Sequence, residues 1–96
     1  MDIKEFVESI SGNDCPFESE YLKALWLEKK GNWDEAHNII QRINTKIAAW
    51  VHAYLHRREG DEWNANYWYR SANKNPNKKS LNEEWEELTR FFLQKL

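Results

Sequence analysis

Three histidines are the residues in this sequence whose type and spacing could support chemistry. His52 and His56 are four residues apart, so they share one face of a helix, and metal-binding helices use the same spacing. A metal ion would need a third ligand and usually a fourth. His37 is the candidate third ligand, and Glu59, three residues after His56, could add a carboxylate. The candidate polar cluster therefore consists of His37, His52, His56 and Glu59.

The packing of two helices decides whether these side chains meet. If the helices that carry His37 and His52 form an antiparallel hairpin about residues 44 and 45, residues equally far from the turn lie side by side. His37 and His52 form one such pair, and Trp33 and His56 form another. We therefore expect the three histidines to lie in one patch, with Trp33 over His56.

The histidines also have interpretations that need no metal. A histidine in a helical core often bonds a carbonyl, a hydroxyl or an amide and has a structural role. Alternatively, the three side chains could line a pocket for a small molecule or a peptide. The chain lacks an HExxH motif and has a single cysteine, Cys15, so we predict no metal site and no cofactor. It also lacks a glycine-rich phosphate loop, a nucleophile elbow and a Cys-x-x-Cys motif, so we assign no catalytic residues.

A second candidate site combines aromatic and basic residues on another face of the helix predicted at 46–59. Tryptophan, tyrosine and arginine are enriched at the energetically dominant positions of protein interfaces. The predicted binding groove consists of Trp50, Tyr54, Arg57 and Arg58. We expect Trp50, Tyr54 and Arg58 to be partly accessible there. The same face could instead be a seam between helices, because the aromatic residues of a short chain usually form its core.

Three consecutive aromatic residues, Tyr67, Trp68 and Tyr69, cannot all face the core. Successive helical residues turn by about 100°, so the three sweep about 200°. We expect Tyr69 to face inward, Trp68 to pack against the helix at 46–59 or the last helix, and Tyr67 to be exposed. Covering these rings requires the last helix to lie over the array as a lid.

The periodicity of the sequence predicts an all-α fold. Apolar residues recur at spacings of three and four, while strand-like alternation is absent. Pro16 suits the first turn of the second helix, and Gly31 and Gly60 suit the corners after the second and fourth helices. Ser80 and Glu83 form a capping box. The predicted helices are residues 2–11, 17–30, 33–43, 46–59, 62–73 and 81–95.

Length and charge limit the classes of protein. Ninety-six residues are enough for a single helical domain (residues 1–96) and too few for a second core. The formal net charge is −2 with the signs interspersed, so we expect no nucleic-acid partner. Met1 leads into an acidic amphipathic segment, and no apolar run approaches the roughly 20 residues that cross a bilayer. With a single cysteine as well, we expect a cytoplasmic protein without membrane association, in an oligomeric state that the sequence leaves open.

Two segments resemble the tetratricopeptide repeat, a helical hairpin whose pattern includes an alanine followed four residues later by a large residue. The matching positions are Gly31, Ala36 and Ile40 in "GNWDEAHNII", and Gly60, Ala65, Tyr69, Ala72 and Pro76 in the second segment. The match is partial. Gly31 and Gly60 are 29 residues apart, against roughly 34 in the family, and Glu20 and Lys23 stand where large apolar residues belong.

The resemblance implies an array of short antiparallel helical hairpins that binds a peptide or another protein in a groove lined by the first helix of each hairpin. It also implies that His52 and His56 face the partner helix of their hairpin. The stretch "WVHAYLHRREGDEWNANYWYRSA" is further similar to an uncharacterised family of small bacterial helical proteins, from which no activity follows. We therefore expect a small helical scaffold or interaction module with a protein or peptide partner. The alternative is a small-molecule-binding, metal-binding or catalytic protein that uses His37, His52 and His56.

Overall fold

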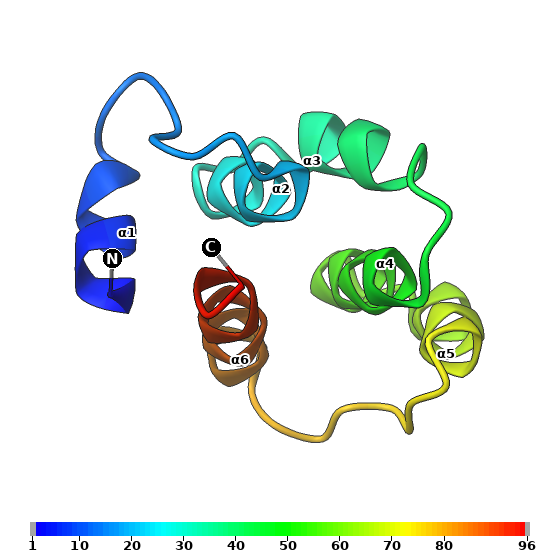
Figure 1. Cartoon of the computed structure of the whole chain (residues 1–96). Coiled ribbons are helices and arrows are strands. Elements are labelled where there is room, and N and C mark those ends of the chain that lie inside the picture. The colour runs from blue at the N-terminus through cyan, green and yellow to red at the C-terminus, as the bar shows by residue number, and fades with distance from the viewer. Residues whose placement is uncertain (1, 96) are drawn as a thin grey trace.

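The computed structural model describes residues 2–95, and this part of the chain forms six helices and no strand (Figure 1). The helices are α1 (Ile3–Ser9), α2 (Glu20–Lys29), α3 (Trp33–Ile40), α4 (Lys46–Arg58), α5 (Glu62–Ser71) and α6 (Leu81–Leu93). The all-α prediction is confirmed, and each predicted helix is present within a few residues of its expected bounds. In the described part of the chain, no helix combines the length and the apolar character needed to cross a bilayer.

Side-chain caps begin several of the helices. The Thr45 hydroxyl accepts a hydrogen bond from a backbone N–H three residues on, at the start of α4. The Asp61 carboxylate does the same for α5. The capping box of Ser80 and Glu83 is present at the start of α6, as predicted. These caps satisfy N–H groups that have no partner inside the first turn of a helix.

The second helix begins later than predicted. The expectation that Pro16 lies in its first turn is wrong, because α2 begins at Glu20, after Ser19, whose hydroxyl caps the helix. Phe17 precedes the helix and packs against Phe6 of α1, with the ring centroids 5.6 Å apart. The segment before α2 therefore packs against α1, and Ser19 caps the helix.

Two helical hairpins occupy the middle of the chain. α2 packs against α3, α4 packs against α5, and α3 also contacts α4, so the hairpins lie side by side. Both corners turn at glycine, with φ of 94° at Gly31 and 86° at Gly60, a left-handed conformation that favours glycine. Ala36 and Ala65 are buried in the second helix of each hairpin. Their small side chains let the paired helices approach closely.

The last helix packs across both hairpins. α6 contacts α1, α2 and α4, and it lies among these three helices in Figure 1. The apolar stripe of α6 is buried in the core and includes Trp85, Leu88 and Phe92. The helix covers the array as expected, but it runs along α2 and α4 rather than along α5.

The predicted binding groove is closed by this helix. Trp50 is 6% exposed and Tyr54 is fully buried, so the expectation that both are accessible is wrong. The physical reason is that α6 lies against this face of α4, where Phe91 meets Trp50 edge-on with ring centroids 5.7 Å apart. Arg57 keeps 20% of its side chain accessible and Arg58 keeps 38%, so Arg58 alone matches the expected accessibility.

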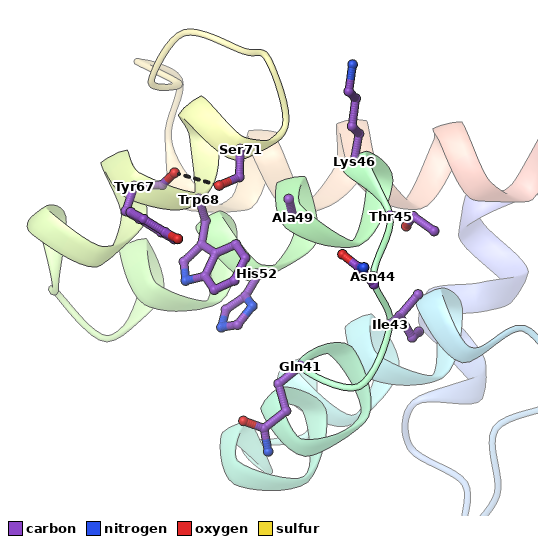
Figure 2. A pocket seen from close by; sticks show the side chains of 10 residues that line it. All are labelled: Gln41, Ile43, Asn44, Thr45, Lys46, Ala49, His52, Tyr67, Trp68 and Ser71. Carbon is purple, nitrogen blue, oxygen red and sulfur yellow. Dashed lines mark hydrogen bonds between the residues drawn. The ribbon is translucent and has the colours of Figure 1, made fainter.

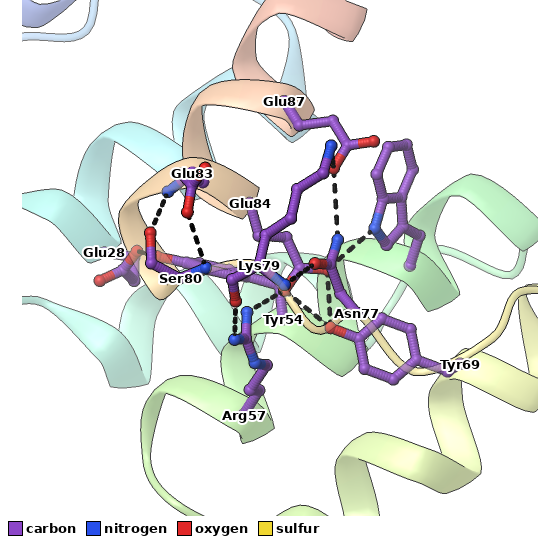
Figure 3. A network of polar contacts seen from close by, with 11 residues as sticks. Glu28, Tyr54, Arg57, Tyr69, Asn77, Lys79, Ser80, Glu83, Glu84 and Glu87 are labelled. Atoms are coloured by element: carbon purple, nitrogen blue, oxygen red, sulfur yellow. Dashed lines mark hydrogen bonds and ion pairs between the residues drawn. The ribbon is translucent and has the colours of Figure 1, made fainter.

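A buried carboxylate ties α6 to the same face (Figure 3). Glu84 has no exposed surface. Its oxygens accept hydrogen bonds from the Trp50 indole at 3.2 Å and from the Arg57 guanidinium at 2.9 Å, both on α4. The Tyr69 hydroxyl of α5 donates to it at 2.6 Å. One side chain therefore links three helices.

A second buried carboxylate lies beside the first. Glu28 of α2 is 5% exposed, accepts a hydrogen bond from the Tyr54 hydroxyl at 2.6 Å and pairs with Arg58 at 3.4 Å. Burial and the adjacent Glu28 carboxylate raise the pKa of Tyr54, and burial and the bond to Glu84 raise the pKa of Tyr69. Both hydroxyls therefore stay protonated and donate. The residues of the predicted groove therefore bind two carboxylates of their own chain.

Replacing Glu84 with alanine should destabilise the fold by about 3–5 kcal/mol, because the charge of Arg57 loses its partner inside the protein. Urea denaturation followed by circular dichroism measures this change. Glu86→Ala removes an exposed glutamate from the same helix and is the matched control, with an expected change below about 0.5 kcal/mol. A Glu84→Ala variant as stable as this control would contradict the role of Glu84 as a link between helices.

Candidate functional site

The three histidines converge where α3 meets α4. His37 belongs to α3, while His52 and His56 belong to successive turns of α4. Nε2 of His37 and Nε2 of His52 are 2.9 Å apart, and the three side chains offer ring nitrogens that lie within 4.8 Å of one another. The structure thus brings together the residues that the hairpin register predicts to be neighbours.

Two tryptophans fix the orientation of these rings. Trp33 stacks on His37 with centroids 4.8 Å apart, and its indole donates a hydrogen bond to the carbonyl of Leu55 at 2.7 Å. Trp68 of α5 stacks on His52 with centroids 3.9 Å apart, which places Trp68 against α4, as expected. Because both imidazoles pack against large flat rings, their side chains have little freedom to rotate. Trp33 also meets His56 edge-on, with centroids 5.8 Å apart.

Glu59 orients the third histidine. Its carboxylate lies 2.7 Å from Nδ1 of His56, one helical turn away. The tautomer that donates this hydrogen bond from Nδ1–H carries its lone pair on Nε2. His56, Glu59 and Asp61 also offer ligand atoms within 4.8 Å of one another, so the carboxylates form a second polar group at the edge of the cluster.

Burial keeps the central histidine neutral. His52 is 6% exposed, and desolvation, together with the neighbouring His37 and His56, lowers the pKa of His52 from 6.5 to about 3. Desolvation also lowers the pKa of His37. A neutral imidazole has one nitrogen with a free lone pair, so each of these two rings can accept a hydrogen bond or ligate a metal ion.

A pocket of about 510 Å³ lies beside His52 (Figure 2). The turn between α3 and α4 forms one wall, and faces of α4 and α5 form the others. In Figure 2, the rings of His52 and Trp68 lie against each other at this pocket. The lining residues are Gln41, Ile43, Asn44, Thr45, Lys46, Ala49, His52, Tyr67, Trp68 and Ser71.

No sequence pattern marks several of these lining residues as part of a site. Gln41, Asn44 and Lys46 belong to a polar turn and a helix start of an ordinary kind, and they match no motif. They form a pocket because α5, which packs against α4, adds Tyr67, Trp68 and Ser71 to the lining. Tyr67 is 46% exposed and Tyr69 is buried, so the predicted orientations of these two rings are confirmed.

α5 exposes two large aromatic side chains on one face. Trp63 is 75% exposed, and Tyr67 follows it four residues later, one helical turn away. Tyr67 also lines the pocket, so the exposed face and the pocket form one continuous surface. Aromatic residues at such a surface are typical of sites that bind another molecule.

Cys15 lies away from the histidines, in the loop before α2. Its side chain is half-buried, and burial raises the pKa of the thiol. A raised pKa disfavours the thiolate that a nucleophilic cysteine needs.

Comparisons of the chain with protein-family models, with curated proteins and with solved structures find no match. We therefore infer what the site can do from its own residues.

The lowered pKa of His52 predicts that the metal-free protein loses stability in mild acid. The unfolded chain takes up a proton near pH 6.5, whereas folded His52 takes it up only near pH 3. Stability is therefore full above pH 6.5 and falls as the pH drops toward 3. Between about pH 7.5 and 5.5, His52 should account for a loss of about 1.4 kcal/mol, measured by urea denaturation in the presence of a chelator.

His52→Gln is the control, because glutamine does not titrate in this range. Its unfolding free energy should depend less on pH than that of the parent by about the same 1.4 kcal/mol. If the parent unfolds with the same free energy at both pH values, His52 is not buried in its neutral form.

Proposed function

We propose that the protein is a small helical interaction module that binds a peptide segment of another protein at α5. We call this region the α5 surface and define it as Trp63, Tyr67 and the pocket beside His52. The single observation that carries the proposal is the 75% exposure of the Trp63 side chain. The proposal keeps the class of function expected from the sequence and moves the binding site from the buried face of α4 to α5.

Because Trp63 is exposed, covering it would contribute a large favourable free energy to the binding of a partner. An aromatic side chain buries roughly 150–250 Å² when it is covered, and each Å² contributes about 25 cal/mol. Covering the exposed part of Trp63 would therefore contribute about 3 kcal/mol before the costs of association. Tyr67, one turn away, would extend the same contact into the pocket.

The pocket indicates what kind of peptide would fit. Tyr67 and Trp68 offer aromatic faces, and the amide groups of Gln41 and Asn44 can bond a peptide backbone. Lys46 adds a positive charge to the lining. The matching peptide would carry an apolar or aromatic residue close to an acidic side chain or a carboxyl terminus.

A tetratricopeptide-like arrangement of the two hairpins is part of the proposal. It is supported by the contact of α3 with α4, which joins the hairpins, and by the recurrence of a glycine corner and a buried alanine in each. In such an array the inner groove lies along the first helices, here α2 and α4. α6 packs along both of these helices. The chain itself then fills the groove, and a partner would bind at α5 instead.

A small molecule is the second candidate ligand for the same pocket. The observation that favours it is the position of His52, whose neutral ring stands in the pocket wall against Trp68. The volume of about 510 Å³ also lies within the range of roughly 300–1,000 Å³ that small-molecule sites occupy.

Peptide selection against the immobilised protein, followed by affinity measurements on the selected peptides, tests the α5 surface. Trp63→Ala and Tyr67→Ala should each weaken binding by about fivefold or more, because truncating a central aromatic residue costs over about 1 kcal/mol. Circular dichroism should show that both variants fold, since both side chains are exposed.

Val7→Ala is the matched control, because it truncates an exposed apolar side chain on α1. It should leave the affinity of every selected peptide unchanged. Selected peptides that bind Trp63→Ala and Tyr67→Ala as tightly as the parent would exclude the α5 surface as the recognition site.

A further inference from the structure

The histidine cluster contains one more imidazole than a hydrogen bond between two rings needs. The 2.9 Å contact between His37 and His52 needs only those two imidazoles, one as donor and one as acceptor. His56 nevertheless brings a third ring nitrogen within 4.8 Å of both. Three imidazole nitrogens this close together match the ligand set of a metal ion in type and number.

A different residue contacts each ring. Trp33 stacks on His37, Trp68 stacks on His52, and the Glu59 carboxylate bonds Nδ1 of His56. A carboxylate on the far nitrogen is the usual partner of a metal-binding histidine, because it sets the tautomer and makes the other nitrogen a better ligand. The cluster therefore has oriented rings as well as ligand atoms of the right type.

The distances require only a small adjustment. A tetrahedral zinc ion with Zn–N bonds of 2.0–2.1 Å holds two ligand nitrogens about 3.3 Å apart. Nε2 of His37 and His52 would separate by a few tenths of an ångström from 2.9 Å, and the ring that donates their hydrogen bond would carry its proton on Nδ1 instead, which frees the lone pair on Nε2. The nitrogen of His56 would move inward from its present place within 4.8 Å of the other two. The first change is a few tenths of an ångström, and the second is at most about 1.5 Å.

We propose that His37, His52 and His56 bind a divalent transition-metal ion, with Zn²⁺ as the best fit. Neutral imidazoles suit the late first-row metals, and zinc accepts three protein nitrogens with a fourth position for water or a ligand. His52 lines the pocket and His37 is half-buried, so solvent reaches the cluster at these two rings. Glu59 positions His56 and is not itself a ligand. The metal site does not rest on the proposed peptide binding, although His52 belongs to both sites.

The competing ligand set, His56 with Glu59 and Asp61, fits less well. The Glu59 carboxylate already bonds His56, and 38% of its side chain is exposed. Both carboxylate oxygens of Asp61 accept hydrogen bonds from Asn64, one of which caps α5. These two carboxylates therefore have structural partners, whereas the three imidazoles face one another.

Metal titration of the chain without a histidine tag, stripped with EDTA, tests the site. Isothermal titration should show one equivalent of Zn²⁺ bound, and Zn²⁺ should raise the thermal midpoint because it binds the native state. Mg²⁺, which prefers oxygen ligands, should do neither. Co²⁺, used as a probe, should give the strong visible bands of a four-coordinate ion.

Single substitutions locate the ion. His37→Gln and His52→Gln should each lower the affinity for Zn²⁺ by more than about 100-fold, since each removes a ligand. Glu59→Gln should lower it by about 10–100-fold, the usual cost of losing a residue that orients a ligand. Asp61→Asn is the matched control, because asparagine also caps helices well, and it should leave the affinity unchanged.

Each outcome decides for or against the site. A Zn²⁺ affinity that survives His37→Gln but falls with Asp61→Asn would place the ion on the competing set and overturn the proposal. A parent protein whose midpoint does not respond to Zn²⁺ would overturn it as well. Circular dichroism checks that each variant folds, and if His52→Gln fails to fold, the half-buried His37 supplies the deciding variant.

Discussion

The burial of one carboxylate constrains most of this structure. Glu84 has no exposed surface, and a charge in that position is tolerated only if donors surround it. Those donors are side chains of α4 and α5, and the observed position of α6 places Glu84 between Trp50, Arg57 and Tyr69. Glu28 repeats the arrangement between α2 and α4. The two carboxylates fix the register of four helices, which apolar packing alone would specify less sharply.

This constraint divides the surface of α4. Its residues from Ala48 to His56 are all buried, so the helix runs through the centre of the protein. One side, with Trp50 and Tyr54, is committed to the carboxylates of the chain. The other side carries His52 and His56 toward α3 and α5. The imidazoles of α4 therefore lie on the side of the helix that α6 does not cover.

The proposed metal site and the proposed peptide site share His52 and the Trp68 ring stacked on it. His52 ligates the proposed ion on one side and lines the pocket on the other, and Trp68 stacks on it while forming part of the pocket wall. An ion would hold His52, and His52 would hold Trp68, so the shape of the pocket depends on the cluster. Trp63, the most exposed residue of the α5 surface, lies in the first turn of α5, and its exposure does not depend on the histidine cluster.

The sequence by itself determined the six helices and the histidine patch, because both follow from local rules. Helical periodicity, glycine corners and caps such as Ser80 act within a few residues, and a short hairpin makes His37 a neighbour of His52 once its turn is known. Pro16 misled the prediction, because contact with α1 decided the conformation before α2. Only the tertiary structure decided what covers each face. Spacing shows which residues share a side of a helix, but it does not show which other helix covers that side. α6 is distant in sequence from α4, yet it closes the predicted groove. Glu84 has the sequence context of a surface glutamate in a first helical turn, and only the packing of α6 buries it.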